Sequence, residues 1–166
     1  MDVQLFRIDD RLIHGQVVLG WAKPLKSERI LLCDDEVSQN DWEKELYCTC
    51  VPVNLEAMIY GIKETADFLT QANGKGARTI VLVKDPGVAM QIVNKGYVPG
   101  SINLGGLHFN DHRKKYLPYV YMNNEEVEQI HWLLDKGISI YCQDIPTGRK
   151  YDVREIVGTL DPGVGN

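Results

Sequence analysis

The chain has 166 residues, of which 44% are hydrophobic and 25% charged, and this composition is typical of a globular domain and excludes a disordered or fibrous protein. Its formal net charge of −5 argues against broad electrostatic binding to nucleic acid or to an anionic membrane surface. The chain begins without a basic leader and apolar core, and no apolar run approaches the roughly 18 residues that span a bilayer, so we expect a cytoplasmic location.

Short apolar runs alternate with segments of helical periodicity along the chain. The predicted strands cover residues 3–8, 29–33, 55–60, 79–83, 101–104, 119–122 and 138–142. The predicted helices cover residues 15–22, 63–72, 86–94 and 124–136, with one more between Ser38 and Pro52. This alternation predicts an α/β fold, a single-domain open, mainly parallel β-sheet with helices on both faces. Residues 1–158 are expected to form the domain and residues 159–166 a loose C-terminal tail.

Two local patterns carry further expectations. In the helix after Ser38, the spacing of Trp42, Leu46 and Tyr47 predicts one buried face. After the strand at residues 101–104, the pair Gly105-Gly106 predicts a flexible turn.

The first strand leads into a loop that contains His14. In open parallel sheets, ligand sites gather outside the carboxyl ends of the strands, and His14 lies there at the start of a short predicted helix. An imidazole is partly unprotonated at neutral pH, so His14 could attack a phosphoryl donor. Arg7 and Arg11 could hold the phosphate oxygens, because transferred phosphoryl groups carry spread negative charge. Either Asp9 or Asp10 could orient His14 or an arginine.

Backbone amides complete this predicted phosphate cradle. At the start of a helix the first amides have no partner within the helix, and those of Gly15, Gln16 and Val17 would therefore favour an added negative charge.

Residues 7–17 read Arg-Ile-Asp-Asp-Arg-Leu-Ile-His-Gly-Gln-Val, and this run closely resembles the N-terminal signature of mannose/fructose/sorbose-type enzyme IIB proteins of the bacterial phosphoenolpyruvate-dependent sugar phosphotransferase system (PTS). The signature includes the phosphorylated histidine of that family. Residues 35–37 resemble the exit of the family's second strand, and residues 103–106 resemble its Asn-Val-Gly-Gly loop. The segment 107–112 departs from the family pattern, because it is polar and rich in histidine.

The resemblance implies that the chain is a phosphotransferase. His14 would accept phosphate from a histidine of a IIA domain and pass it to a sugar held by the membrane subunits IIC and IID, which would keep the chain peripherally at the inner face of the membrane. No metal or organic cofactor is implied, and the sequence leaves a homo-oligomer open. Arg11 matches a family position thought to contact phosphate. Position alone assigns the remaining members of the pocket, which are Arg7, Asp9, Asp10, Gly15, Gln16, Val17, Gly105 and Gly106.

Four alternatives are weighed against this interpretation. A phosphorylation-state sensor would use the same histidine without transport. A receiver-like domain phosphorylated on aspartate would explain Asp34-Asp35, but Lys84 stands at the wrong point in the order. A nucleotide-binding domain would need a glycine-rich turn after the first strand, where His14 stands instead. A metal site at His108 and His112 would need a regular helix, which the neighbouring glycines and proline disfavour.

Overall fold

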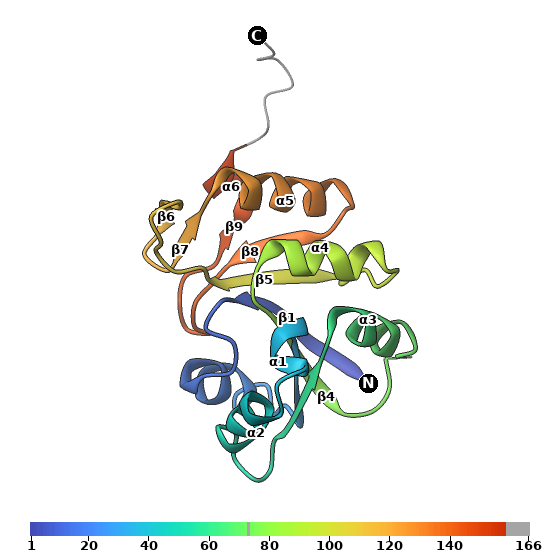
Figure 1. Cartoon of the computed structure of the whole chain (residues 1–166). Helices are drawn as coiled ribbons and strands as arrows, with labels where there is room; N and C mark the ends of the chain where they lie inside the picture. The colour runs from blue at the N-terminus through green and yellow to red at the C-terminus, as the bar shows by residue number, and fades with distance from the viewer. Residues whose placement is uncertain (73, 159–166) are drawn as a thin grey trace.

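A seven-stranded sheet forms the centre of the computed structural model, which describes residues 1–72 and 74–158 (Figure 1). The strand order is β3-β2-β4-β1-β5-β8-β9, and all neighbours pair in parallel except β8 and β9. The strands are β1 (Asp2–Asp9), β2 (Arg29–Cys33), β3 (Glu56–Tyr60), β4 (Arg78–Val83), β5 (Ser101–Gly106), β8 (Ser139–Cys142) and β9 (Tyr151–Asp152). A separate antiparallel hairpin consists of β6 (Lys114–Leu117) and β7 (Val120–Met122).

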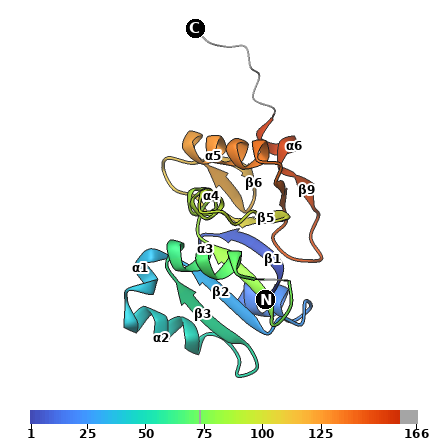
Figure 2. The same cartoon turned by 90° about the vertical axis from the view of Figure 1, so that its right-hand side faces the viewer.

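Helices cover both faces of the sheet. They are the π-helix η1 (Gln16–Ala22) and the α-helices α1 (Asp35–Ser38), α2 (Asp41–Thr49), α3 (Ile62–Thr70), α4 (Pro86–Asn94), α5 (Asn124–Asp135) and α6 (Val153–Val157). On one face α3, α4 and α5 pack over the sheet, and Figures 1 and 2 show α4 and α5 side by side. On the other face η1 packs against a second hydrophobic cluster.

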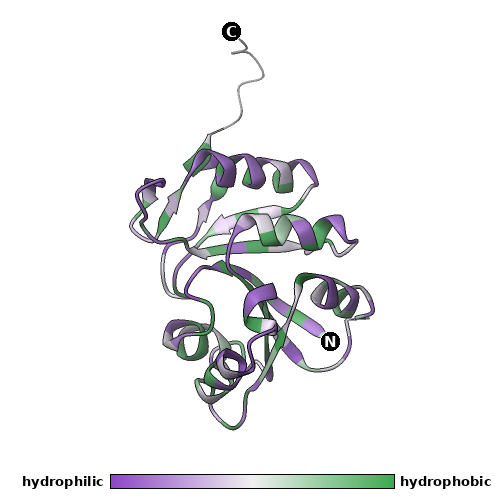
Figure 3. Cartoon of the chain, in the orientation of Figure 1, coloured by the Kyte–Doolittle hydropathy of each residue, from purple (hydrophilic) through white to green (hydrophobic). Residues whose placement is uncertain are grey.

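The strands alternate between these two clusters. In β2, Leu31 belongs to the cluster under α3 and α4, whereas Ile30 and Leu32 belong to the cluster under η1. Each of these side chains is fully buried. Central strands of a parallel sheet are covered on both sides, which explains why they appear in the sequence as unbroken apolar runs. The helices carry both hydrophobic and hydrophilic residues, as expected for elements with one face on the sheet (Figure 3).

The predicted fold class is therefore confirmed. The strands at 29–33 and 79–83 lie where the apolar runs placed them, and β5 and β8 follow the same pattern with shifts of one or two residues. β6 and β9 were not predicted, because a four-residue strand and a two-residue strand carry little periodic signal. The expected tail at 159–166 lies outside the described residues. Within the described residues, no helix is long and apolar enough to cross a membrane.

Two local expectations were wrong. The short helix α1, capped by Asp34, precedes the helix predicted between Ser38 and Pro52, which is present as α2 and is capped by Asn40. The second of these, α2, buries no side chain completely, and Trp42 is 70% exposed. The glycine pair does not form a turn either, since Gly105 and Gly106 are the last two residues of strand β5.

Candidate functional site

The carboxyl ends of β1 and β5 bring the two predicted motifs together. The two strands are adjacent and parallel, so that Arg7 lies opposite Asn103 and Asp9 opposite Gly106. After Asp9 the chain turns sharply through Leu12, whose φ of 60° belongs to the left-handed region, and reaches His14 just before η1. The strand register thus places the signature loop against the end of β5.

Asp9 is the centre of this arrangement. Its carboxylate is fully buried and receives Arg7 Nη2 at 2.9 Å, Arg11 Nε at 3.1 Å and His14 Nε2 at 3.2 Å. Burial alone would raise the pKa of this carboxyl, but the hydrogen bonds from His14 and Arg11 and the charge of Arg7 outweigh it and hold the pKa below its ordinary value. Asp9 is therefore a permanent negative charge that joins two arginines and the histidine.

Arg7 forms a buried ion pair with Asp9, and its side chain has no exposed surface. Its guanidinium also donates to Asn103 Oδ1 at 2.6 Å and to the carbonyl oxygens of Gln143 and Asp144 at 3.2 and 3.1 Å. The ring of Trp21 stacks on it, with the guanidinium carbon 5.3 Å from the ring centroid. We expected Arg7 to hold phosphate oxygens directly. Its complete burial corrects that expectation, because a guanidinium engaged on this many sides does not face solvent.

The side chains of Arg7 and Asp9 approach strand β5 closely at the two positions that glycine occupies, 105 and 106. A Cβ placed on Gly105 would lie 1.9 Å from the guanidinium carbon of Arg7, and one on Gly106 would lie 3.1 Å from an Asp9 carboxylate oxygen. The first distance is far below any van der Waals contact. The glycine pair thus leaves room for the Arg7–Asp9 ion pair rather than contacting phosphate from a loop.

The ring of His14 is held at both nitrogens and is 19% exposed. Nε2 faces the Asp9 carboxylate, and the backbone amide of Gln16 donates to Nδ1 at 3.3 Å. Since an ionised carboxylate can only accept, Nε2 carries the proton and Nδ1 keeps its lone pair. The predicted free amides are partly engaged, because the Val17 amide donates to the His14 carbonyl at 3.0 Å.

Arg11 is the more accessible of the two arginines, with 37% of its side chain exposed. Nε and Nη2 contact Asp9, and Nη2 also donates to Gln16 Oε1 at 2.6 Å. Nη1 makes no hydrogen bond to any described residue. One edge of this guanidinium is therefore available to an incoming anion next to His14.

Asp10 contacts a different segment from the one that holds His14. Its carboxylate oxygens meet His108 Nδ1 at 2.5 Å, the His108 amide at 2.8 Å and Arg113 Nη1 at 2.8 Å. Of the two aspartates proposed as orienting groups, only Asp9 contacts His14 within the described structure. The contacts of Asp10 with residues about a hundred positions further along the chain were missed, since no local pattern signals them.

Ligand atoms of Asp9, Asp10 and His108 lie within 4.8 Å of one another, which raises the question of a metal ion. The two carboxylates are already neutralised by guanidinium groups, Asp9 by Arg7 and Arg11 and Asp10 by Arg113. A divalent cation among these arginines would be repelled. The cluster fits an anion at its edge better than a cation at its centre.

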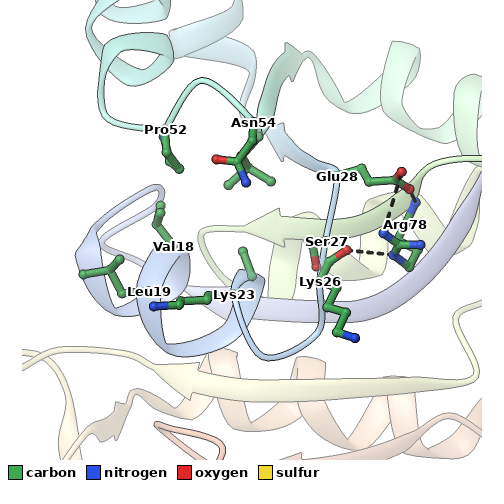
Figure 4. A pocket seen from close by; sticks show the side chains of 11 residues that line it. Val18, Leu19, Lys23, Lys26, Ser27, Glu28, Pro52, Asn54 and Arg78 are labelled. Carbon is green, nitrogen blue, oxygen red and sulfur yellow. Dashed lines mark hydrogen bonds and ion pairs between the residues drawn. The ribbon is translucent and has the colours of Figure 1, made fainter.

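A cavity lies at the opposite edge of the sheet. It has a volume of about 450 Å³ and is lined by Val18, Lys23 and Arg78, among others (Figure 4). Arg78 begins β4 and Glu28 directly precedes β2, so the cavity borders the amino ends of the strands. It is therefore separate from the His14 site, which lies at the carboxyl ends and is open to solvent.

Residues 3–161 match the family model described as the PTS system sorbose subfamily IIB component. The chain belongs to this family. It is 26% identical over 157 residues to the fructose-specific EIIB component of Bacillus subtilis, a match that covers 95% of this chain and 96% of the relative. It is also 27% identical to the mannose-specific EIIAB component of Escherichia coli, of which it covers 50%.

Solved structures agree on the fold of this family member. The IIBSor domain of the sorbose permease from Klebsiella pneumoniae superimposes with a TM-score of 0.87 at 21% identity, covering 95% of this chain and 96% of that domain. A protein from Thermoanaerobacter tengcongensis superimposes with a TM-score of 0.86 at 26% identity, covering 97% and 98%. As a IIB component, the chain is a transferase of a sugar phosphotransferase system.

Proposed function

We propose that the chain accepts a phosphoryl group on His14 from a phosphorylated IIA domain and passes it to a sugar during uptake through IIC and IID membrane subunits. The observation that carries this proposal is the fixed state of the His14 ring, with Nε2 held by buried Asp9 and Nδ1 left as the basic nitrogen. A surface histidine without such a partner would exchange tautomers and rotate. Here the nucleophile is aimed before the donor arrives.

The chemistry follows from this tautomer. The lone pair of His14 Nδ1 attacks the phosphorus, a new N–P bond forms, and the N–P bond of the donor histidine breaks with its electron pair returning to the donor ring. The proton stays on Nε2, where the Asp9 carboxylate stabilises the positive charge of the phosphorylated ring. In the transfer to a sugar, the hydroxyl oxygen attacks the phosphorus and forms an O–P bond, the N–P bond of His14 breaks with its electron pair returning to Nδ1, and the hydroxyl proton passes to water or to a base beside the sugar.

Arg11 is the cation best placed to stabilise the transferred group. Asp9 and Gln16 fix its guanidinium next to His14, and its exposed edge can contact the phosphoryl oxygens as charge spreads over them. The Gln16 amide now bound to Nδ1 can turn to the same oxygens once that nitrogen carries phosphorus. Arg7 acts through Asp9, and Gly105 and Gly106 act by making room for the pair.

The family supports these partners as a class. The mannose-specific relative of Escherichia coli is named as an EIIAB component, in which the part resembling this chain covers half the length. A IIA donor and membrane subunits at the inner face of the membrane are therefore our proposal for this chain as well. The alternative of a sensor without transport is not favoured by a family described as a IIB component.

The test is intact-mass analysis after incubation with phosphoenolpyruvate, enzyme I, the histidine phosphocarrier protein and a cognate IIA. We expect one phosphoryl group on the wild-type chain, lost in mild acid, and none on His14→Ala. The fold of His14→Ala should be unchanged, because the ring is attached to a loop and contributes little to the core. Phosphate on His14→Ala, or none on wild type with a donor of proven activity, would contradict the proposal.

A second variant tests whether the positive charge of Arg11 stabilises the transferred phosphoryl group. Arg11→Ala should slow phosphorylation of His14 by roughly 100-fold to 1,000-fold, the usual cost of removing one group that stabilises developing charge. Rapid-quench measurement of the single-turnover rate gives this number directly. A rate equal to wild type would remove Arg11 from the pocket.

A further inference from the structure

Asp10 connects the His14 loop to residues 108–115. It holds this segment by three contacts, to the ring and the amide of His108 and to the guanidinium of Arg113. Asp9 and Asp10 are consecutive, so one side of the loop carries the phosphorylation chemistry and the other carries this segment. The segment therefore lies directly against the loop that holds His14.

The same segment is anchored on helix α5. Arg113 donates to Glu126 through Nε at 3.0 Å and through Nη2 at 2.5 Å, and it also donates to the His108 carbonyl at 2.8 Å. Glu126 in turn accepts from the backbone amide of Asn123 at 2.9 Å and forms the capping box of α5. The segment is thus fixed between the His14 loop and a helix, which gives it a defined shape.

The segment presents an apolar ring and unpaired positive charge. Phe109 is 67% exposed and rests edge-on against Tyr121, with ring centroids 5.9 Å apart. Lys114 and Lys115 are exposed and form no ion pair with any residue that the structure describes. The whole chain has a formal charge of −5, so this cationic run stands out against the charge of its surroundings. An exposed aromatic ring beside unpaired lysines is typical of a surface that contacts an acidic partner.

We propose that residues 108–115 form a docking wall for the phosphorylated donor, a protein that carries its phosphohistidine in an acidic and partly apolar surface. This inference rests on the proposed function. For transfer, the donor phosphorus must come within bonding distance of His14, so the donor also covers the segment that Asp10 holds against the same loop. Phe109 supplies the apolar anchor of the contact, and the lysines attract the acidic donor. Asp10 is a positioning residue, because it acts through the wall and not on the histidine.

The experiment measures the rate of His14 phosphorylation by rapid quench over a range of phosphorylated IIA concentrations. For Phe109→Ser we expect the half-saturating donor concentration to rise by roughly tenfold, the effect of losing one interface anchor. For Lys114→Gln/Lys115→Gln we expect a rise of roughly three- to tenfold at low salt that disappears at about 0.5 M salt, where surface charges are screened. In both variants the rate at saturating donor should stay within about twofold of wild type.

Asp10→Asn separates positioning from chemistry. It should raise the half-saturating donor concentration and leave the saturated rate nearly unchanged, whereas Asp9→Asn should lower the saturated rate. A purely structural role for Asp10 would lower both the saturated rate and the fraction of folded protein.

Matched controls lie on other surfaces. Trp42→Ser removes an aromatic ring that is 70% exposed on α2, a helix that packs on α1 and β3. Lys26→Gln/Lys95→Gln removes two exposed charges at the amino edge of the sheet, near the start of β2 and the end of α4. Both controls should show wild-type half-saturation.

The outcomes distinguish this inference from the proposed function. Wild-type half-saturation in all three wall variants, with normal phosphate on His14, would overturn the docking wall alone, whereas no phosphate on the wild-type chain would overturn the proposed function. Loss of binding to phosphatidylglycerol vesicles in the lysine variant, with unchanged half-saturation for the donor, would also overturn the wall and assign the charges to the membrane surface.

Discussion

Gly105→Ala should damage the site by the addition of a single methyl group. The new Cβ would lie 1.9 Å from the guanidinium carbon of Arg7 and 2.0 Å from its Nη1, so the buried guanidinium must move. Any movement stretches its bonds to Asn103 at 2.6 Å and to Asp9 at 2.9 Å. We therefore expect the substitution to break a buried ion pair rather than only to crowd the core.

The magnitude follows from these two effects. Overpacking a close-packed interior costs about 1–3 kcal/mol, and leaving one partner of a buried ion pair without the other costs about 3–5 kcal/mol. Because movement of the guanidinium relieves the overlap but breaks the ion pair, the second cost applies, and we expect the free energy of unfolding to fall by about 3–5 kcal/mol. Small domains are stable by only about 5–15 kcal/mol, so the variant should be marginally stable and slow in phosphotransfer.

Urea unfolding followed by tryptophan fluorescence measures this loss. Gly100→Ala is the matched control, because a Cβ there meets nothing within 4 Å. In the background Arg7→Ala, the change Gly105→Ala should cost much less, since the group it strikes is gone. A Gly105→Ala variant within about 0.5 kcal/mol of wild type, or an equal loss in both backgrounds, would refute the reasoning.

Two other predictions concern titration. The pKa of Asp9 is lower in the folded chain than its ordinary value of 3.8, so ionised Asp9 stabilises the fold above about pH 4 and loses this contribution as the pH falls further. The difference in unfolding free energy between wild type and Asp9→Asn should therefore shrink below about pH 4. A constant difference down to about pH 2 would contradict this prediction. Burial raises the pKa of Cys33 and of Cys142 to about 12, whereas Cys48 and Cys50 are exposed. Iodoacetamide at about pH 8 should therefore label two thiols in the native chain and four after unfolding, and mass spectrometry counts the labels.

The sheet could be predicted well from the sequence, because strands that are buried on both faces consist almost entirely of apolar residues. The residues of β2 and β4 are apolar almost throughout, and short apolar runs between helical segments are typical of parallel strands covered on both faces. The prediction of a buried face on α2 failed for a related reason, although the helix itself is present. Helical spacing shows that Trp42 and Leu46 share a face, but it does not show whether another element covers that face.

The candidate site was predictable only where its contacts are local. Asp9 and His14 are five residues apart, and the sequence placed either Asp9 or Asp10 beside the histidine. The choice between them depends on the partners of Asp10, which lie about a hundred residues further along the chain at His108 and Arg113. The burial of Arg7 depends likewise on Gln143 and its neighbour, and no periodicity near residue 7 could indicate that.

The contacts of Arg7 with residues far along the chain also determine when the site can form during synthesis. His14 is synthesised well before the carbonyl groups that fix Arg7, because these belong to Gln143 and Asp144, which are 136 and 137 positions after Arg7. Since domains acquire such distant contacts only when the sequence that supplies them has been made, a nascent or truncated chain presents the histidine without its support. Formation of the proposed phosphorylation centre is thus coupled to completion of the domain, and we expect that an unfinished chain does not compete with the complete domain for phosphate.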